Sequence, residues 1–381
     1  MVPMKCRNVV LVLPLLIGAC GASKSTETGS DADGSQTPID AEPVGDDAVW
    51  GDVYQGSDPT VPFLPDGRAR YWRYAFERPP AGTALRIDGA LQAVRYQAVD
   101  VYDDETRTSI GVLRDNELDG ALQMWVADER DLAGLDGPAL PFPDGRTAIF
   151  LRLYDPEDQV PDAVLPMVSL VDLETGEVSA PPARIEPPEI PQAVIDAVVE
   201  GQIIEQREDR VDFYRLDDAG LYAAADNDYL VARIVREPGE LVVLSFEPPT
   251  HATSATDAAD VRYWSLTQCD RQSYCHHTVA DLEIERFDGR VEMVIGDEDE
   301  ELRAASGDRT FVPWSTPGEE LLLIYRNLAT SEGVAHAVDA VPVFDHEQPA
   351  EGQEATATLG RRAPSGVRCP RSAFLDGTCA L

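Results

Sequence analysis

Apolar residues recur in short runs along most of the chain, and Gly, Pro and Asp separate the runs. The runs Met167 to Val171, Val291 to Ile295 and Leu321 to Tyr325 are rich in Val, Ile and Leu. Short runs of such residues between turn formers predict β-strands. Strands this short and this numerous predict an all-β chain built from β-sandwiches of the jelly-roll type.

The segment from Asp260 to Asp270 shows the alternation most clearly. Because successive side chains of a strand point to opposite faces, Trp264 and Leu266 share one face and Tyr263 and Ser265 the other. We expect Trp264 to anchor a core, with its indole N–H satisfied near the edge of the sheet.

Three stretches of the first half have counterparts, in the same order, in the second half. In the clearest pair, Val94 to Asp103 and Val261 to Asp270, Val, Arg, Tyr and a closing Asp fall at identical spacing. A repeated order of this kind predicts a duplicated unit, and therefore two tandem sandwiches. The other pairs are Tyr71 to Arg78 with Tyr229 to Arg236, and Ala148 to Tyr154 with Leu321 to Tyr325.

Residues 48–180 form the first predicted sandwich, and residues 207–345 form the second. Residues 181–206 begin as a Pro-rich linker and continue as one helix over Gln192 to Gln206, where apolar residues recur at helical spacing. This helix either bridges the two sandwiches or packs on the second. Residues 346–381 are expected to form a C-terminal tail with a cysteine pair.

The start of the chain has the pattern of a secretory signal. A short basic segment precedes an apolar run, Val9 to Ile17, that is shorter than the about 20 residues of a membrane-spanning helix. The run ends in Ile17-Gly18-Ala19-Cys20, the order of a lipobox. Residues 1–19 are therefore predicted to be a lipoprotein signal peptide, and Cys20 the lipidated residue. The alternative is an ordinary cleaved signal with a chance cysteine.

Residues 20–47 are acidic and polar with almost nothing to bury, so we expect a disordered tether. This N-terminal pattern resembles that of bacterial lipoproteins, which implies that acyl chains on Cys20 bind the lipid bilayer. Gly21 stands where an aspartate would favour retention at the inner membrane. The expected address is therefore the outer membrane, on its periplasmic face or at the cell surface.

The net charge of the chain limits the kinds of macromolecule that it can bind. The chain has 31 Lys and Arg against 69 Asp and Glu, for a formal net charge of −38. Such a chain repels nucleic acid, so no nucleic-acid partner is expected.

Four cysteines lie beyond the lipobox, at Cys269, Cys275, Cys369 and Cys379. In an exported protein, four cysteines indicate two disulfides, for which three connectivities are possible. We favour the local pairing of Cys269 with Cys275 and of Cys369 with Cys379. The crossed pairings would instead join the C-terminal tail to the turn that follows the Trp264 strand.

A set of motifs in the second half extends the interpretation. The motifs are Trp264-Ser265-Leu266-Thr267, Asp288-Gly289 before the run Val291 to Ile295, and Pro313-Trp314 before the run Leu321 to Tyr325. In order and spacing they are similar to those of an uncharacterised family of secreted bacterial proteins. The family carries a C-terminal jelly-roll unit with a Tyr/Phe-Trp-Ser-Leu strand and a late Trp-Pro turn. The resemblance implies fold and export, and it implies no catalytic residues.

Acidic runs are the candidate metal sites. Asp297, Asp299 and Glu301 present oxygen ligands of the kind that calcium prefers, and Asp103-Asp104-Glu105 occupies the corresponding turn of the first unit. The alternative is that each run is a solvated loop. Calcium is the only cofactor that we consider for these carboxylates.

Zinc is a second possibility at Cys269, Cys275, His276 and His277, since thiolate and imidazole are zinc ligands. An oxidising compartment favours a disulfide at these cysteines instead.

Two aromatic residues, Tyr263 and Trp314, are candidate ligand contacts, because aromatic rings can line a sugar-binding face; core packing is the alternative use. Gly-x-Ser-x-Gly, His-Glu-x-x-His and the nucleotide-binding fingerprints are absent from the sequence. We therefore expect a lipid-anchored envelope protein with a non-catalytic binding or structural role. The alternative is a hydrolase that acts on glycans or envelope polymers.

Overall fold

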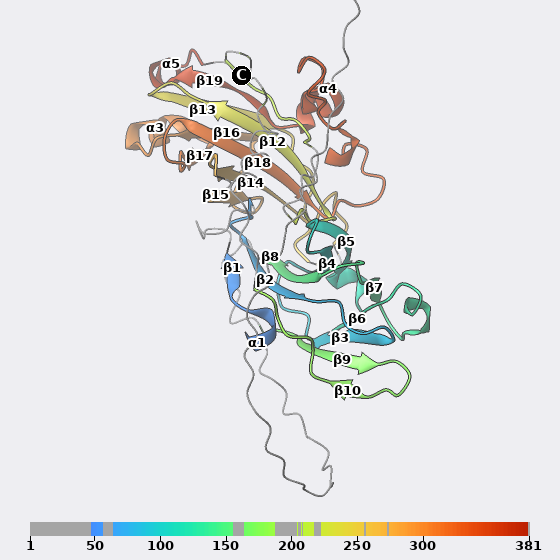
Figure 1. The fold of residues 1–381 in the computed structure, drawn as a ribbon. Coiled ribbons are helices and arrows are strands. Elements are labelled where there is room, and N and C mark those ends of the chain that lie inside the picture. The colour runs from blue at the N-terminus through green and yellow to red at the C-terminus, as the bar shows by residue number, and fades with distance from the viewer. Residues whose placement is uncertain are drawn as a thin grey trace, which may run out of the picture. The chain divides into compact units, whose positions relative to one another are not determined.

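The computed structural model describes residues 47–55, 64–154, 164–186, 204, 207, 209–216, 222–254, 257–272 and 274–379. Its strands form four sheets, here called A to D, and the predicted all-β sandwich fold is confirmed (Figure 1). Sheet A has the order β1 (Val53–Gln55), β2 (Ala69–Phe76), β8 (Thr147–Tyr154), β4 (Tyr96–Asp103) and β5 (Thr108–Arg114). Sheet B has the order β10 (Val178–Ser179), β9 (Met167–Asp172), β3 (Thr83–Gly89), β6 (Leu122–Ala127) and β7 (Ala139–Pro141).

The second half of the chain forms the other two sheets. Sheet C has the order β11 (Arg210–Val211), β19 (Ser365–Pro370), β13 (Glu240–Phe246), β16 (Val291–Gly296) and β17 (Thr310–Pro313). Sheet D has the order β12 (Asn227–Val235), β18 (Glu320–Leu328), β14 (Tyr263–Cys269) and β15 (Cys275–Ala280). The short helices are α1 (Asp47–Trp50), α3 (Glu300–Ser306), α4 (Ala355–Leu359) and α5 (Arg371–Leu375).

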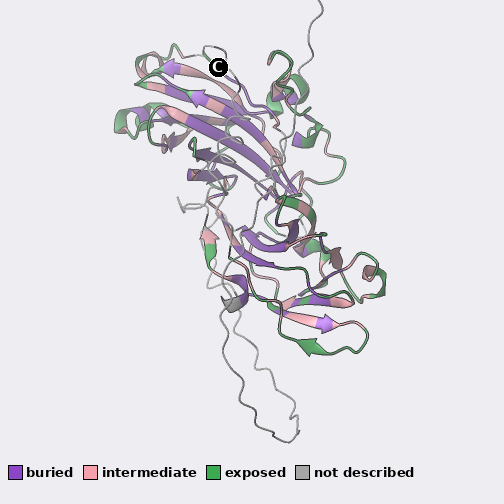
Figure 2. Cartoon of the chain, in the orientation of Figure 1, coloured by how far each residue is buried: buried purple, intermediate pink, exposed green. Residues whose placement is uncertain are grey.

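Sheets A and B enclose the core of the first sandwich. Sheet A contributes Trp72, Val99 and Leu151, and sheet B contributes Ile87 and Met124. The central strands of both sandwiches are buried along most of their length (Figure 2). Full burial of each large apolar side chain stabilises the fold by about 1.5–3 kcal/mol. Strands buried in this way therefore consist mostly of apolar residues.

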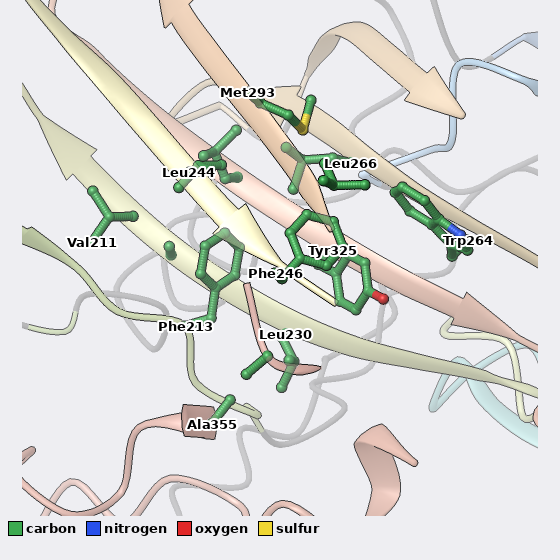
Figure 3. Close-up of a cluster of buried hydrophobic side chains, with 14 of the residues drawn as sticks. Val211, Phe213, Leu230, Leu244, Phe246, Trp264, Leu266, Met293, Tyr325 and Ala355 are labelled. Carbon is green, nitrogen blue, oxygen red and sulfur yellow. The ribbon is translucent and has the colours of Figure 1, made fainter. Parts of the chain in front are cut away.

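Sheets C and D enclose the core of the second sandwich, where aromatic rings meet (Figure 3). The ring centroid of Phe246 lies 5.5 Å from that of Trp264 and 5.4 Å from that of Tyr325. Trp264 is fully buried, as expected of a core anchor. The expectation for its indole was wrong, because Nε1 has no hydrogen-bond partner among the described residues. The ring lies between the two sheets, among apolar neighbours, and not at a polar sheet edge.

The two sandwiches repeat one strand plan. The order β2-β8-β4-β5 of sheet A recurs as β12-β18-β14-β15 in sheet D, and β9-β3-β6-β7 of sheet B recurs as β19-β13-β16-β17 in sheet C. In sheets B and C the last pair, β6–β7 or β16–β17, is parallel, whereas the other paired strands are antiparallel.

The repeat extends to the register of single residues. Corresponding rows across the strands are Tyr71–Arg152–Ala98 in sheet A and Tyr229–Arg326–Ser265 in sheet D. The matches of Tyr71 with Tyr229 and of Ala98 with Ser265 are those that the sequence repeat predicts, whereas the match of Arg152 with Arg326 comes from the strand pairing. The second copy therefore has the same strand pairing as the first, residue for residue, across these rows.

The predicted C-terminal tail, residues 346–381, supplies part of the second sandwich. Its strand β19 pairs with β13 on one side and with β11 on the other, so the sandwich continues past residue 345. The polar and Pro-rich sequence around β19 hides this strand, since only Val367 and Cys369 give it an apolar pattern. Both disulfides have the local connectivity, Cys269 with Cys275 and Cys369 with Cys379.

Some predictions fall on parts of the chain that the structure does not describe. The signal peptide over residues 1–19, Cys20, the tether up to residue 46 and most of the predicted helix over residues 192–206 lie outside the described residues. Among the described residues, none of the helices has the length and apolar character that a membrane span requires. Residues 41–381, which hold both sandwiches, form one compact unit.

Candidate functional site

The outer faces of sheets A and D meet in a buried contact, which we call the sandwich contact. In β4 the side chains of Val99 and Val101 point into the first core, so those of Tyr96 and Ala98 point outward. These two residues pack against Tyr263, whose side chain points outward from sheet D. The alternation of each central strand thus gives one face to its own core and the other to the sandwich contact.

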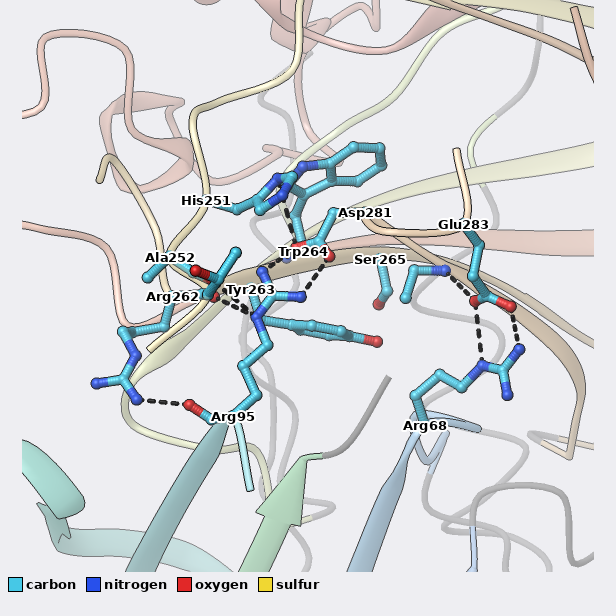
Figure 4. Close-up of polar contacts among 12 residues, drawn as sticks. Arg68, Arg95, His251, Ala252, Arg262, Tyr263, Trp264, Ser265, Asp281 and Glu283 are labelled. Carbon is cyan, nitrogen blue, oxygen red and sulfur yellow. Dashed lines mark hydrogen bonds and ion pairs between the residues drawn. The ribbon is translucent and has the colours of Figure 1, made fainter. Parts of the chain in front are cut away.

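Two buried ion pairs cross the sandwich contact in opposite directions. Arg95, just before β4, binds Asp281, just after β15, with Nη1–Oδ1 and Nη2–Oδ2 distances of 2.5 and 2.8 Å (Figure 4). Arg262, just before β14, binds Asp115, just after β5, through Nη2 and Oδ2 at 3.0 Å. Arg95 and Arg262 occupy the same position of the repeat, and so do Asp115 and Asp281. The contact is therefore reciprocal, as in a twofold-symmetric dimer.

Backbone groups complete the two pairs. Asp281 accepts a hydrogen bond from the Trp264 backbone N–H at 3.0 Å, and Asp115 accepts one from the Gln97 backbone N–H at 3.2 Å. Each arginine also donates to a carbonyl oxygen of the other segment, including Arg95 Nε to the carbonyl of Arg262 at 3.1 Å. Buried charges that are paired and hydrogen-bonded in this way are costly to separate, about 3–5 kcal/mol when one partner is removed.

Aromatic rings follow the same symmetry. The guanidinium of Arg95 lies 5.5 Å from the ring centroid of Tyr263, and that of Arg262 lies 5.6 Å from the ring centroid of Tyr96. Desolvated cation–π contacts of this kind contribute up to about 2 kcal/mol each. Each arginine is thus held both by a carboxylate and by a tyrosine of the opposite sandwich.

Both tyrosine hydroxyls end on aspartates of the opposite sandwich. Tyr263 donates to Asp66 at 3.1 Å, and Tyr96 donates to Asp226. Burial raises the pKa of the Tyr263 hydroxyl well above its usual value. Burial also raises the pKa of Asp226, to about 7, and the nearby charge of Asp228 adds to the shift. The sandwich contact therefore holds a carboxyl group that titrates near neutral pH.

Two further arginines are buried on the outer faces of sheets A and D. Arg152 and Arg326 occupy matching rows, and each lies 5.8 Å from the ring centroid of the tyrosine beside it, Tyr71 or Tyr229. Their polar partners differ. Arg152 Nε lies 3.1 Å from Asp100 Oδ2, whereas Nη1 of Arg326 donates to the hydroxyl oxygen of Thr267. Burial raises the pKa of Asp100, and the guanidinium of Arg152 opposes this shift.

The carboxylates predicted to bind calcium have arginine partners. Asp297 Oδ1 lies 2.7 Å from Arg236 Nη2, and Arg371 Nη2 lies 3.0 Å from Asp299 Oδ2 and 2.5 Å from Glu301 Oε2. Asp299 also caps α3, since its side chain accepts from the backbone N–H of Leu302. That hydrogen bond, followed by Arg371, lowers the pKa of Asp299. The run is therefore a helix start that is bound by arginines.

The corresponding run of the first unit is also committed to internal contacts. Asp103 accepts hydrogen bonds from the backbone N–H groups of Glu105 and Thr106, both at 2.9 Å. Asp104 is buried and pairs with Arg73. Across the described part of the chain, no group of three or more His, Cys, Asp or Glu is arranged to hold a metal ion.

The predicted zinc and ligand residues also have internal roles. Cys269 and Cys275 form a disulfide, and His276 lies 2.7 Å from Asp270. Tyr263 is fully buried in the sandwich contact. Trp314 packs on the second core, and the Arg236 guanidinium lies 4.0 Å from its ring centroid. Packing was the alternative use of both aromatic residues.

Sequence reasoning did not identify the residues of the sandwich contact. The signal was present, because the repeated Val-Arg-Tyr triplet contains Arg95 and Tyr96 in one copy and Arg262 and Tyr263 in the other. The acidic partners lie 186 and 147 residues from their arginines along the chain, so spacing alone does not reveal them.

One comparison with a solved structure supports the fold, and the fold alone. The chain is similar to an uncharacterised protein from Burkholderia cenocepacia with a TM-score of 0.55 and 11% identity, over 86% of this chain and 83% of that chain. A protein from Vibrio parahaemolyticus gives a TM-score of 0.44 and 10% identity, over 71% of this chain and 87% of that one. No family model matches the chain, and no curated protein sequence matches it.

Proposed function

We propose that this chain is a lipid-anchored envelope protein in which two joined sandwiches serve a non-catalytic binding or structural role outside the cytoplasm. The observation that carries the proposal is the pair of disulfides, Cys269–Cys275 and Cys369–Cys379, together with the lipobox that ends at Cys20. Disulfides persist in oxidising compartments, and a lipobox sends a chain to the same side of the membrane.

The sandwich contact supports the structural side of the proposal. Its charged and aromatic groups, such as Arg95, Asp281 and Tyr263, are buried and bonded to one another. Groups held in this way fix two sandwiches against each other. The acidic run at Asp297 to Glu301 is bound by arginines and contributes to the packing of α3 and α5.

Lipidation is tested by metabolic labelling with an alkyne fatty acid in a bacterial host. The full chain should incorporate the label and fractionate with membranes, and Cys20→Ser should lose both properties. Cys6→Ser is the matched control and should keep them. An unlabelled full chain, or equal labelling of C20S, would refute the lipid anchor.

The binding role is tested by thermal shift on residues 46–381 after treatment with a chelator. Calcium, zinc and a panel of envelope sugars are then added back one at a time. A ligand that binds the native state at a hundredfold excess over its dissociation constant adds about 2.7 kcal/mol of stability. We expect no shift with calcium, since arginines bind the candidate carboxylates; a calcium shift that is lost in Asp297→Asn would contradict this assignment.

A further inference from the structure

We propose that Asp226 is a proton-linked latch of the sandwich contact, which holds the two sandwiches more tightly when its carboxyl group is neutral than when it is charged. Asp226 lies just before β12 of the second sandwich and reaches into the first sandwich. Its side chain is 1% exposed. The latch would make the strength of an intramolecular contact depend on external pH.

The surroundings of Asp226 favour a neutral carboxyl. Tyr96 of β4 donates its hydroxyl to Oδ2, and Arg114 Nε donates to the same oxygen at 3.4 Å. Oδ1 is buried with no hydrogen-bond partner among the described residues. A buried carboxylate normally gathers several donors, because ionisation in a dry site is costly. Both donors to this carboxyl reach Oδ2 and none reaches Oδ1, so ionisation is only partly compensated and the neutral form is favoured while the contact is closed.

The charged groups around Asp226 do not reverse this preference. Arg114 of β5 places Nε 3.4 Å from Oδ2, and its side chain is one-third exposed, so water screens it. Arg262, before β14, lies over the ring of Tyr96 and is committed to Asp115. Asp228 of β12 is a like charge that opposes ionisation, and burial raises the pKa of Asp226 to about 7.

The direction of the pH effect follows from linkage. A group whose pKa is higher in the closed state binds more protons there than in the open state. The closed state therefore loses stability as the pH rises from 3.8, the ordinary pKa of an aspartate, to the raised pKa of Asp226. With a pKa of about 7 in the closed contact and 3.8 in water, the opening equilibrium rises about tenfold from pH 6 to pH 8 and then levels off.

Hydrogen–deuterium exchange of the full chain, corrected for the intrinsic pH dependence of exchange, measures this opening at segments 96–103 and 222–230. The wild type should lose about tenfold protection there between pH 6 and pH 8. Asp226→Asn, which stays neutral, should show flat protection over the same range. Asp66→Asn is the matched control, since Asp66 accepts the corresponding tyrosine hydroxyl, and it should keep the pH dependence.

A direct titration keeps the proposal testable if a variant fails to fold. The carboxyl carbon shift of Asp226 in isotope-labelled wild type should change with a midpoint near pH 7. A midpoint below pH 5 would overturn the latch. So would corrected exchange that does not change with pH in the wild type, or a pH dependence that persists in D226N or disappears in D66N.

Discussion

The two sandwiches share a strand plan but protect their outer sheets differently. On the outer face of sheet C, Val243 and Val294 lie under α3 and α5 in a second apolar layer. The same positions of sheet B hold Arg86, which is exposed, and Trp125, and the guanidinium of Arg86 lies 5.6 Å from the ring centroid of Trp125. One strand plan thus supports either a covered apolar face or a polar face that meets water. The choice depends on a few side chains and on what the connections between strands contain.

The connections themselves show how the difference arose. Between β16 and β17 the chain forms α3, capped by Asp299, and its residue Leu302 reaches the apolar layer. Between β6 and β7 the corresponding connection makes only a 3-10 turn over Leu132–Gly134. Both disulfides also belong to the second sandwich. The second copy therefore has added helices on its outer sheet, whereas α1, the added helix of the first copy, packs Val49 and Trp50 into the core between its two sheets.

The largest expected effect on stability comes from breaking the sandwich contact, to which both copies contribute matching residues. Arg95→Ala should lower the free energy of unfolding by about 3–5 kcal/mol, because it leaves Asp281 buried without a counter-charge. Arg262→Ala should cost less within that range, since Asp115 is 8% exposed and Asp281 is not exposed. Chemical denaturation measures both. Arg68→Ala removes a partly exposed ion pair with Glu283 and should cost only about 0–1 kcal/mol. If R95A cost no more than R68A, the role assigned to Arg95 in the sandwich contact would be refuted.

The next effect separates the two outer faces. Phe374→Ala should destabilise the protein by about 3 kcal/mol, because this side chain of α5 packs in the second apolar layer. Met167→Ala, on the outer face of sheet B, should change stability by no more than about 0.5 kcal/mol, since Met167 is 56% exposed. Denaturation midpoints at constant m-value test the pair. Similar losses in both variants would remove the distinction between the faces.

Reduction should act on one sandwich only. Loop-closure entropy predicts a loss of about 3 kcal/mol for Cys369→Ser with Cys379→Ser, and of about 2 kcal/mol for Cys269→Ser with Cys275→Ser. Hydrogen exchange in reductant should report lost protection in β14, β15 and β19 before any loss in β3 and β6. Simultaneous loss in all these strands would mean that the two copies unfold as a single cooperative unit.

The smallest effect tests the matched arginines. Thr267→Val keeps the shape of the side chain but removes the oxygen to which the charged Arg326 donates, so it should cost about 1.5 kcal/mol. Thr83→Val, which removes an exposed hydrogen bond to Pro80, is the matched control and should cost less. Thermal unfolding of the two variants decides the matter, and a larger cost for T83V would contradict the importance of the Thr267 contact.

Much of this architecture was predictable because its signals are local. Strand runs such as Leu321 to Tyr325, the repeat and the core position of Trp264 all follow from alternation and spacing. The parallel β16–β17 pair was not predictable, because β17 has only 4 residues and shows no clear alternation. The inner position of β19 was not predictable either, since its partner β13 lies far away in sequence and leaves no periodic trace. The indole of Trp264 was misplaced for the same reason: its polar surroundings depend on neighbours from other strands.

The residues of the sandwich contact show the same limit of prediction from sequence. The sequence repeat marked Arg95 and Arg262 as a matched pair but gave no reason to connect them to Asp281 and Asp115. Acidic residues are so abundant here, 69 in all, that composition cannot select the two that matter. Conversely, carboxylates of the conspicuous acidic run at Asp297 to Glu301 form ion pairs with Arg236 and Arg371.

A reciprocal contact of this kind has a consequence for dilution. Two separate subunits joined by the same ion pairs would dissociate as their concentration falls, whereas halves joined in one chain meet at an effective concentration that the linker sets. Each chain therefore contains both partners of the contact in a one-to-one ratio. The two halves would stay in contact at any protein concentration, however few copies of the chain a cell makes.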